Sequence, residues 1–299
     1  MIQVLAIGDA GSPSLIRNRM ARAIVKTSPK DAVLMLGDNF YEYGISSENE
    51  DRWHTDFENV FHPTCPWLAI LGNHDYLGNP QAQVTYSYVK PATQWTMPAR
   101  YYDKKLYFDK KSGDGDGVHI FCLDTFDLSP SESALNTRAM SLTSPFLWNR
   151  LSNGMKDRAV TQLEWLDRSL ASSTMTWKIV AGHYPIFSGG GHGDNPELIA
   201  RLKPILDRHR VNLYLCGHDH DLQHIVKEDM HYIVSGTGSR YHPLRDSSRN
   251  YDVIPRSTGV SFMRFFKTHA LIGFTDETSI FYEKTILPRS SHVYYKIGP

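Results

Sequence analysis

Short apolar runs recur along the first two thirds of the chain, and each ends in a polar cluster. Their length and their content of β-branched residues predict strands that are buried in the interior. Six such runs are Gln3–Ile7, Ala32–Leu36, Trp67–Leu71, Val118–Leu123, Lys178–Ala181 and Asn212–Cys216.

Helical patterns separate several of these runs. One helix is expected to have Ser12 as its cap and Pro13 as its first residue. Its apolar face would comprise Leu15, Ile16, Met20, Ala23 and Ile24. Asn195 and Pro196 open a second helix, whose inner side would comprise Leu198, Ile199, Leu202, Ile205 and Leu206. The stretch Ala159–Ala171 predicts a third helix.

From about His231 onward the pattern changes to strands joined by turns. These strands are expected at Tyr232–Ser235, Val260–Phe266, Ala270–Thr275, Ile280–Thr285 and Val293–Ile297. Strands alternating with helices, followed by consecutive strands, predict an α/β fold with antiparallel additions. The segment Leu128–Asp157 has little pattern, and we interpret it as a long surface excursion. With no repeat or linker in the sequence, we expect one domain over residues 1–299.

Charge and hydropathy exclude several kinds of partner. The 32 basic and 32 acidic side chains cancel, so no general field attracts nucleic acid or an anionic membrane. No apolar run approaches the roughly 20 residues that cross a bilayer. The chain does contain 14 histidines, which are most useful as metal ligands or proton carriers.

The sequence says little about compartment. Met1–Asp9 has no charged leader and enters a predicted strand at once, so we do not expect it to act as a signal peptide. Cys65, Cys122 and Cys216 show no CxxC spacing, and no Asn-x-Ser/Thr glycosylation signal occurs. We therefore leave the location open: cytoplasmic by default, and secreted or organellar if the N-terminus was trimmed.

Five polar clusters follow the predicted strands. They are Gly8–Gly11, Gly37–Tyr41, Gly72–Asp75, Ala181–His183 and Gly217–His220. In open α/β sheets, loops beyond the carboxyl ends of the strands converge on a ligand site. A glycine in each cluster permits a tight turn that directs side chains to a shared point.

These clusters contain a set of metal-binding side chains. Its members are Asp9, Asp38, Tyr41, Asn73, His183, His218 and His220. Oxygen and imidazole nitrogen suit iron, zinc or manganese, and the absence of cysteine argues against a structural zinc or iron–sulfur site. Seven ligands are too many for one catalytic ion, but they fit two ions that share a bridging carboxylate. Such a pair would supply a hydroxide and neutralise phosphate charge.

The order and the residues of the five clusters resemble those of the purple acid phosphatases, within the calcineurin-like metallophosphoesterases. The similarity extends over nearly the whole chain and is greatest to the small, mammalian-like tartrate-resistant members. It implies a four-layer α/β/β/α sandwich of two mixed sheets flanked by helices. It also implies a monomer that hydrolyses small phosphorylated substrates or phosphoproteins by in-line attack of a metal-bound hydroxide.

The resemblance also implies a role for each site residue. Asp9, Tyr41 and His220 would bind Fe(III), with Asp38 bridging to a second ion. Asn73, His183 and His218 would hold that ion, which would be Fe(II), Zn(II) or Mn(II). His74 would contact phosphate and protonate the leaving alcohol, and His192 would also face substrate. Asp75 would orient neighbouring imidazoles.

Departures from the family and two rival functions remain. Ala10 replaces an aromatic residue of mammalian relatives, and regions 126–131 and 192–199 lack their disulfide. The segment 128–157 aligns with their protease-sensitive loop but has a different sequence. One rival is a phosphodiesterase or nucleotide hydrolase of the same superfamily, and the other is a non-catalytic scaffold. His242 and the histidines outside the clusters are assigned to surface or structural positions.

Overall fold

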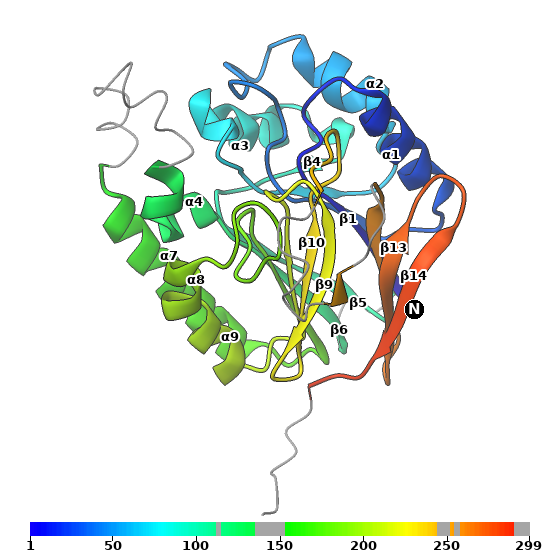
Figure 1. The fold of residues 1–299 in the computed structure, drawn as a ribbon, viewed down its shortest axis with the longest axis vertical. Coiled ribbons are helices and arrows are strands. Elements are labelled where there is room, and N and C mark those ends of the chain that lie inside the picture. The colour runs from blue at the N-terminus through cyan, green and yellow to red at the C-terminus, as the bar shows by residue number, and fades with distance from the viewer. Residues whose placement is uncertain (112–114, 135–152, 244–251, 254–257, 290–299) are drawn as a thin grey trace, which may run out of the picture.

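Two mixed β-sheets form the centre of the protein, and helices cover their outer faces (Figure 1). The computed structural model describes residues 1–111, 115–134, 153–243, 252–253 and 258–289. The layers run helix, sheet, sheet, helix, so the expected α/β/β/α sandwich is confirmed. That one domain covers all 299 residues stays a prediction.

The first sheet has the order β14-β13-β12-β1-β2-β3-β4. Its strands are β1 (Ile2–Ile7), β2 (Ala32–Met35), β3 (Trp67–Ala69), β4 (Trp95–Thr96), β12 (Val260–Phe265), β13 (Ala270–Thr275) and β14 (Ile280–Ile286). Strands β1 to β4 are parallel, whereas β12 adds antiparallel to β1 with Ile2 opposite Phe265. All six residues of β1 are buried, as a continuous apolar run predicts for a strand covered on both faces.

The second sheet has the order β11-β9-β10-β8-β7-β6-β5. Its strands are β5 (Tyr102–Tyr107), β6 (Gly117–Cys122), β7 (Trp177–Ala181), β8 (Leu213–Cys216), β9 (Leu222–Lys227), β10 (Met230–Ser235) and β11 (Asp252–Val253). Strands β6, β7, β8 and β10 are parallel, and the others pair antiparallel. The parallel strands of both sheets therefore present their carboxyl ends for loops that carry polar residues.

One group of helices covers each sheet. The larger members are α1 (Leu15–Lys26), α3 (Pro80–Val89), α7 (Met155–Ser172), α8 (Pro196–Arg201) and α9 (Lys203–Arg208). The short ones are η1 (Trp53–Glu58), α2 (Asn59–Phe61), η2 (Asp75–Leu77), η3 (Pro91–Thr93) and α4 (Thr125–Leu128). Apolar residues of α1 and α2 pack in a core with both sheets, and those of α7, α8 and α9 pack on the outer face of the second sheet. In the described part of the chain, no helix has the length and apolar character that crossing a membrane requires.

The predicted strands that lie within the described residues agree with the structure to within two residues, whereas β4, β9 and β11 were not predicted. The first helix also differs. Its N-cap is Ser14, whose Oγ accepts a hydrogen bond from the Arg17 amide at 3.0 Å. The prediction of Ser12 as cap and Pro13 as first residue is therefore wrong. Leu15 is 83% exposed, so it does not belong to the apolar face. The apolar contacts of the helix with the core begin one residue later, with Ile16 and then Met20.

The other two predicted helices are confirmed with changes. Asn195 caps α8 by accepting a bond from the Leu198 amide, and Pro196 is its first residue. The pattern then continues past Leu202 as a separate helix, α9, because Pro204 has no amide proton to donate. Helix α7 begins at Met155, earlier than expected.

The interpretation of 128–157 as a surface excursion is wrong for its first residues. Leu128, Ser129 and Ser133 are buried, because Ser129 bonds to Asn195 and Ser133 donates to the Phe126 carbonyl. The middle of that segment, 135–152, lies outside the described residues, as does the strand expected at Val293–Ile297.

Candidate metal centre

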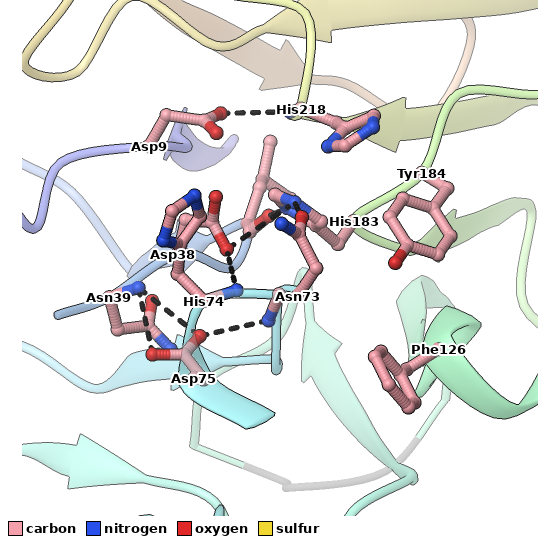
Figure 2. A network of polar contacts seen from close by, with 12 residues as sticks. Asp9, Asp38, Asn39, Asn73, His74, Asp75, Phe126, His183, Tyr184 and His218 are labelled. Atoms are coloured by element: carbon pink, nitrogen blue, oxygen red, sulfur yellow. Dashed lines mark hydrogen bonds and ion pairs between the residues drawn. The ribbon is translucent and has the colours of Figure 1, made fainter. Parts of the chain in front are cut away.

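All five polar clusters lie at one end of the two sheets. Strands β1, β2 and β3 lead to Asp9, Asp38 and Asn73, whereas β7 and β8 lead to His183 and His218. Figure 2 shows these side chains directed at one another from loops of both sheets. They adjoin a cavity of about 720 Å³, whose lining includes Asp38, Asn73, His74, His192, His218 and His220. The convergence predicted from the sequence is therefore present.

Strained backbone helps to direct the acidic side chains. Asp9 and Asp38 both have positive φ, 60° and 53°, which non-glycine residues seldom adopt. The Ser239 hydroxyl donates to the Asp9 carbonyl at 2.5 Å, and the Asp9 amide donates to the Gly37 carbonyl at 3.0 Å. The second bond joins the Asp9 turn to the Gly37–Asp38 turn, and the first joins the Asp9 turn to the segment after β10.

The first donor group surrounds the Tyr41 hydroxyl. It lies 3.1 Å from Asp9 Oδ1, 2.9 Å from Asp38 Oδ2 and 3.1 Å from His220 Nε2. Burial, followed by the charges of Asp38 and Asp9, raises the pKa of Tyr41 well above its ordinary value. A multivalent cation among these oxygens would reverse that balance and favour the phenolate.

The second donor group lies on the other side of Asp38. His183 Nε2 is 3.0 Å from Asn73 Oδ1 and 3.6 Å from Asp38 Oδ1. The Nδ1 of His183 donates to the Leu36 carbonyl at 2.8 Å, which leaves the Nε2 lone pair facing the site. The His218 ring lies 5.0 Å from the His183 ring.

Asp38 belongs to both groups. Its Oδ2 accepts from Tyr41, whereas its Oδ1 accepts from the His74 amide at 2.9 Å and faces His183. Burial would raise the pKa of Asp38, but the nearby His183, His74 and His218 together lower it below its ordinary value. Each carboxylate oxygen thus faces a different set of donors, as a bridging ligand requires.

The donor set fits bound cations. Asp9 and Asp38 are almost fully buried, and ligand atoms of Asp9, Asp38 and His183 lie within 4.8 Å of one another. Among the described residues, neither carboxylate forms an ion pair with lysine or arginine. The basic groups beside them are imidazoles, with His220 Nε2 3.4 Å from Asp9 and His183 Nε2 3.6 Å from Asp38. Metal ions among these groups would lower the cost of burying the two carboxylates.

Two histidines face the cavity beside these donors. His74 Nδ1 donates to the Glu42 carbonyl at 2.6 Å, so its Nε2 is available to the cavity. The His192 ring lies 3.8 Å from that of His218, and its amide donates to Asp219 Oδ1 at 3.0 Å. Burial would lower the pKa of His192, but Glu132 and Asp219 raise it above its ordinary value. The structure thus brings both histidines to the site, although their roles stay predictions.

The role expected for Asp75 is wrong. Its carboxylate accepts hydrogen bonds from the amides of Asn39, Phe40 and Gly72 and from the side chain of Gln83, rather than from imidazoles. Figure 2 shows it beneath the Asp38 and Asn73 loops. Asp75 therefore fixes the two loops by their backbone.

The sequence analysis also missed residues at the rim. His242 lines the cavity with its ring 4.6 Å from that of His220, so its assignment away from the site is wrong. The guanidinium of Arg240 lies 4.3 Å from the Tyr41 ring centroid and pairs with Glu42. Both follow β10 after the turn Gly236–Gly238, so a strand followed by glycines was present, but no acidic residue lies in 236–242 to mark it as a ligand cluster.

The fold and the site together define a metal-dependent phosphoesterase. A model of the calcineurin-like phosphoesterase family matches residues 2–222, and the chain belongs to that family. Within it, the relatives are purple acid phosphatases, which are binuclear metal phosphomonoester hydrolases, and the resemblance noted in the sequence is confirmed.

Two relatives and one solved structure illustrate the similarity. Tartrate-resistant acid phosphatase type 5 of Homo sapiens is 35% identical over 263 residues, covering 83% of this chain and 76% of the relative. Its Mus musculus counterpart is 32% identical over 320 residues, covering 96% and 90%. The structure of GAP50, the anchor in the inner membrane complex of Plasmodium, matches with a TM-score of 0.75 and 21% identity, covering 97% of this chain and 89% of that one. At that identity the match shows a shared fold alone.

Proposed function

We propose that this protein is an acid phosphatase whose Asp9, Tyr41 and His220 hold a ferric ion. Asn73, His183 and His218 hold a second, divalent ion, and Asp38 bridges the two. The observation that carries the proposal is the division of the Asp38 carboxylate, with Oδ2 2.9 Å from Tyr41 and Oδ1 3.6 Å from His183.

When bound, such a pair of ions supplies an activated hydroxide and offsets the negative charge of a phosphate ester. The protein's own contribution is to place the substrate. His74 and His192, which both line the cavity, would donate hydrogen bonds to phosphate oxygens. His74, held at Nδ1 by a carbonyl, is placed to give a proton through Nε2 to the departing alkoxide. The cavity is lined by imidazoles, carboxylates and the Asn73 amide, and with cations bound it would suit small phosphorylated substrates.

The test compares Asp38→Asn with the wild type. We expect the wild-type protein to contain two metal ions including iron, to be coloured, and to hydrolyse an aryl phosphate monoester at acidic pH. Asp38→Asn should lose metal and reduce kcat/KM by about 10³-fold or more, because it removes the shared charged ligand. Asp167→Asn, on the exposed face of α7, is the matched control and should retain both properties.

The same measurements separate the rival functions. A non-catalytic scaffold would hold fewer than two ions and turn over neither substrate. A diesterase would show a higher kcat/KM for a bis-aryl phosphate than for the monoester. Unchanged activity in Asp38→Asn would refute the proposed centre itself.

A further inference from the structure

Glu132 reaches the candidate metal centre from a segment that the sequence analysis left unassigned. Residues 130–134 are helical and follow α4. Glu197 fixes the start of this segment by accepting bonds from the Ser129 hydroxyl at 2.8 Å and the Ser131 amide at 3.1 Å. The Ser133 hydroxyl donates to the Phe126 carbonyl at 2.8 Å. Glu132 is thus held on both sides, and its side chain is only 18% exposed.

A single carboxylate oxygen of Glu132 contacts two imidazoles. Its Oε1 lies 3.0 Å from His192 Nδ1 and 3.0 Å from His218 Nε2. The centroids of the two rings are 3.8 Å apart, with an angle of 38° between the ring planes. The rings are therefore in contact with each other, and one nitrogen of each lies near the same oxygen. Both histidines line the cavity. His192 is expected to meet substrate, and His218 is a proposed ligand of the second ion.

The contacts specify which nitrogen of each ring donates a hydrogen bond to Glu132. An ionised carboxylate only accepts hydrogen bonds, so His192 must donate from Nδ1 and His218 from Nε2. In the proposed centre, His192 would then meet substrate through Nε2, and His218 would bind metal through Nδ1. His183 has the opposite arrangement, since its Nδ1 is fixed by the Leu36 carbonyl. Mutation of a carboxylate or other group that fixes a metal-binding imidazole in this way typically lowers metal affinity or activity by about 10–100-fold.

We propose that Glu132 is a positioning residue that sets the tautomer and orientation of His218 and His192 together. It links the ligand of the second ion to the histidine that meets substrate phosphate. This inference rests on the proposed function, because it takes His218 as a ligand.

The test uses two substitutions of equal length. Glu132→Gln keeps an oxygen that can accept both hydrogen bonds, whereas Glu132→Met fills the same space without an acceptor. The affinity for the second ion is measured by equilibrium dialysis against Zn²⁺ with elemental analysis. Inorganic phosphate binding is measured by calorimetry on protein with both sites filled. Glu164→Met, on the exposed face of α7, is the matched control.

We expect Glu132→Met to weaken Zn²⁺ binding by about 10–100-fold and also to weaken phosphate binding, with Glu132→Gln close to wild type. Equal losses in both variants would mean that Glu132 acts through its charge, as a direct ligand, and would overturn the positioning role. Wild-type behaviour of Glu132→Met would also overturn it. A wild-type protein that binds no pair of ions would instead refute the proposed function.

Discussion

A buried pair of histidines predicts that the protein loses stability in acid. His224 Nε2 lies 2.9 Å from His231 Nδ1, and His224 Nδ1 lies 2.6 Å from the Tyr282 hydroxyl. His224 lies on β9, paired with β10 on one side and β11 on the other, and is fully buried. Burial, with His231 and Lys284, lowers the pKa of His224 to about 3, and burial, with Lys284 and Arg289, lowers that of His231 to about 4.

The sign follows from which state binds more protons. An unfolded histidine titrates near 6.5, so below that pH the unfolded chain takes up protons that the folded pair refuses. Stability is therefore complete above about 6.5 and falls as the pH drops toward the folded values. Between about pH 7 and about pH 5, one such ring removes about 2 kcal/mol from the free energy of unfolding. Because His231 is only half-buried, the pair should remove about 3 kcal/mol.

The perturbation is His231→Asn, whose amide occupies the position of Nδ1 and keeps the bond to His224 while removing one titrating ring. Urea unfolding of the wild type and the variant is measured at both pH values. The variant should lose about 1–2 kcal/mol less between them, whatever its stability at neutral pH. His62→Asn is the control, because His62 is exposed and its positive φ of 45° suits asparagine. An equal loss in wild type and His231→Asn would refute the reasoning.

Three further changes test the site and the core. Tyr41→Phe should abolish the visible absorption band while leaving the circular dichroism spectrum intact, because no phenolate would reach iron; a band that persists contradicts the ligand assignment. Gly72→Ala should cost about 1–3 kcal/mol and at least about tenfold in activity, since an added Cβ would lie 2.2 Å from Asp38 Oδ1; normal urea unfolding and turnover would show that the loop yields. Trp53→Ala should cost about 3–5 kcal/mol in urea unfolding, because this buried indole stacks on Tyr86 at 3.6 Å; a loss below about 1 kcal/mol would count against that packing.

Much of the fold could be predicted from the sequence because buried parallel strands have a distinct local sequence pattern. Each is a mainly apolar run, and β1, β2, β3, β7 and β8 each lead to a glycine-led polar turn, whereas β6 leads to Asp124 without a glycine. Strand β9, Leu222–Lys227, has a weaker pattern, because Gln223 and His224 are polar although both are fully buried. Their partners, Ser188 and Tyr282, lie far along the chain, so local hydrophobicity could not identify the strand.

The same distinction separates the site residues that the sequence revealed from those it did not. The seven proposed ligands follow strands directly, so the topology alone brings them together. Glu132 lies 60 and 86 positions from the two histidines that it contacts, and the packing of 129–133 against α4 and α8 places it there. Arg240 and His242 likewise depend on how the chain leaves β10. Such contacts arise from tertiary packing, for which one sequence offers no periodic pattern.

The distribution of donors between the sheets has a structural consequence. Loops of the first sheet supply the oxygen donors Asp9, Asp38, Tyr41 and Asn73, whereas loops of the second supply the imidazoles His183, His218 and His220. Each proposed ion would therefore be held by both sheets and by neither alone.

Direct bonds already fix the distance between the sheets at this end. The Gly8 amide donates to the Ser235 carbonyl at 2.7 Å, and the His218 amide donates to Asp9 Oδ2 at 2.9 Å. His183 reaches across to the Leu36 carbonyl at 2.8 Å. Because backbone contacts rather than the ligand side chains alone set the spacing, the donors are preorganised, and little of the metal-binding free energy must be spent on closing the two sheets together.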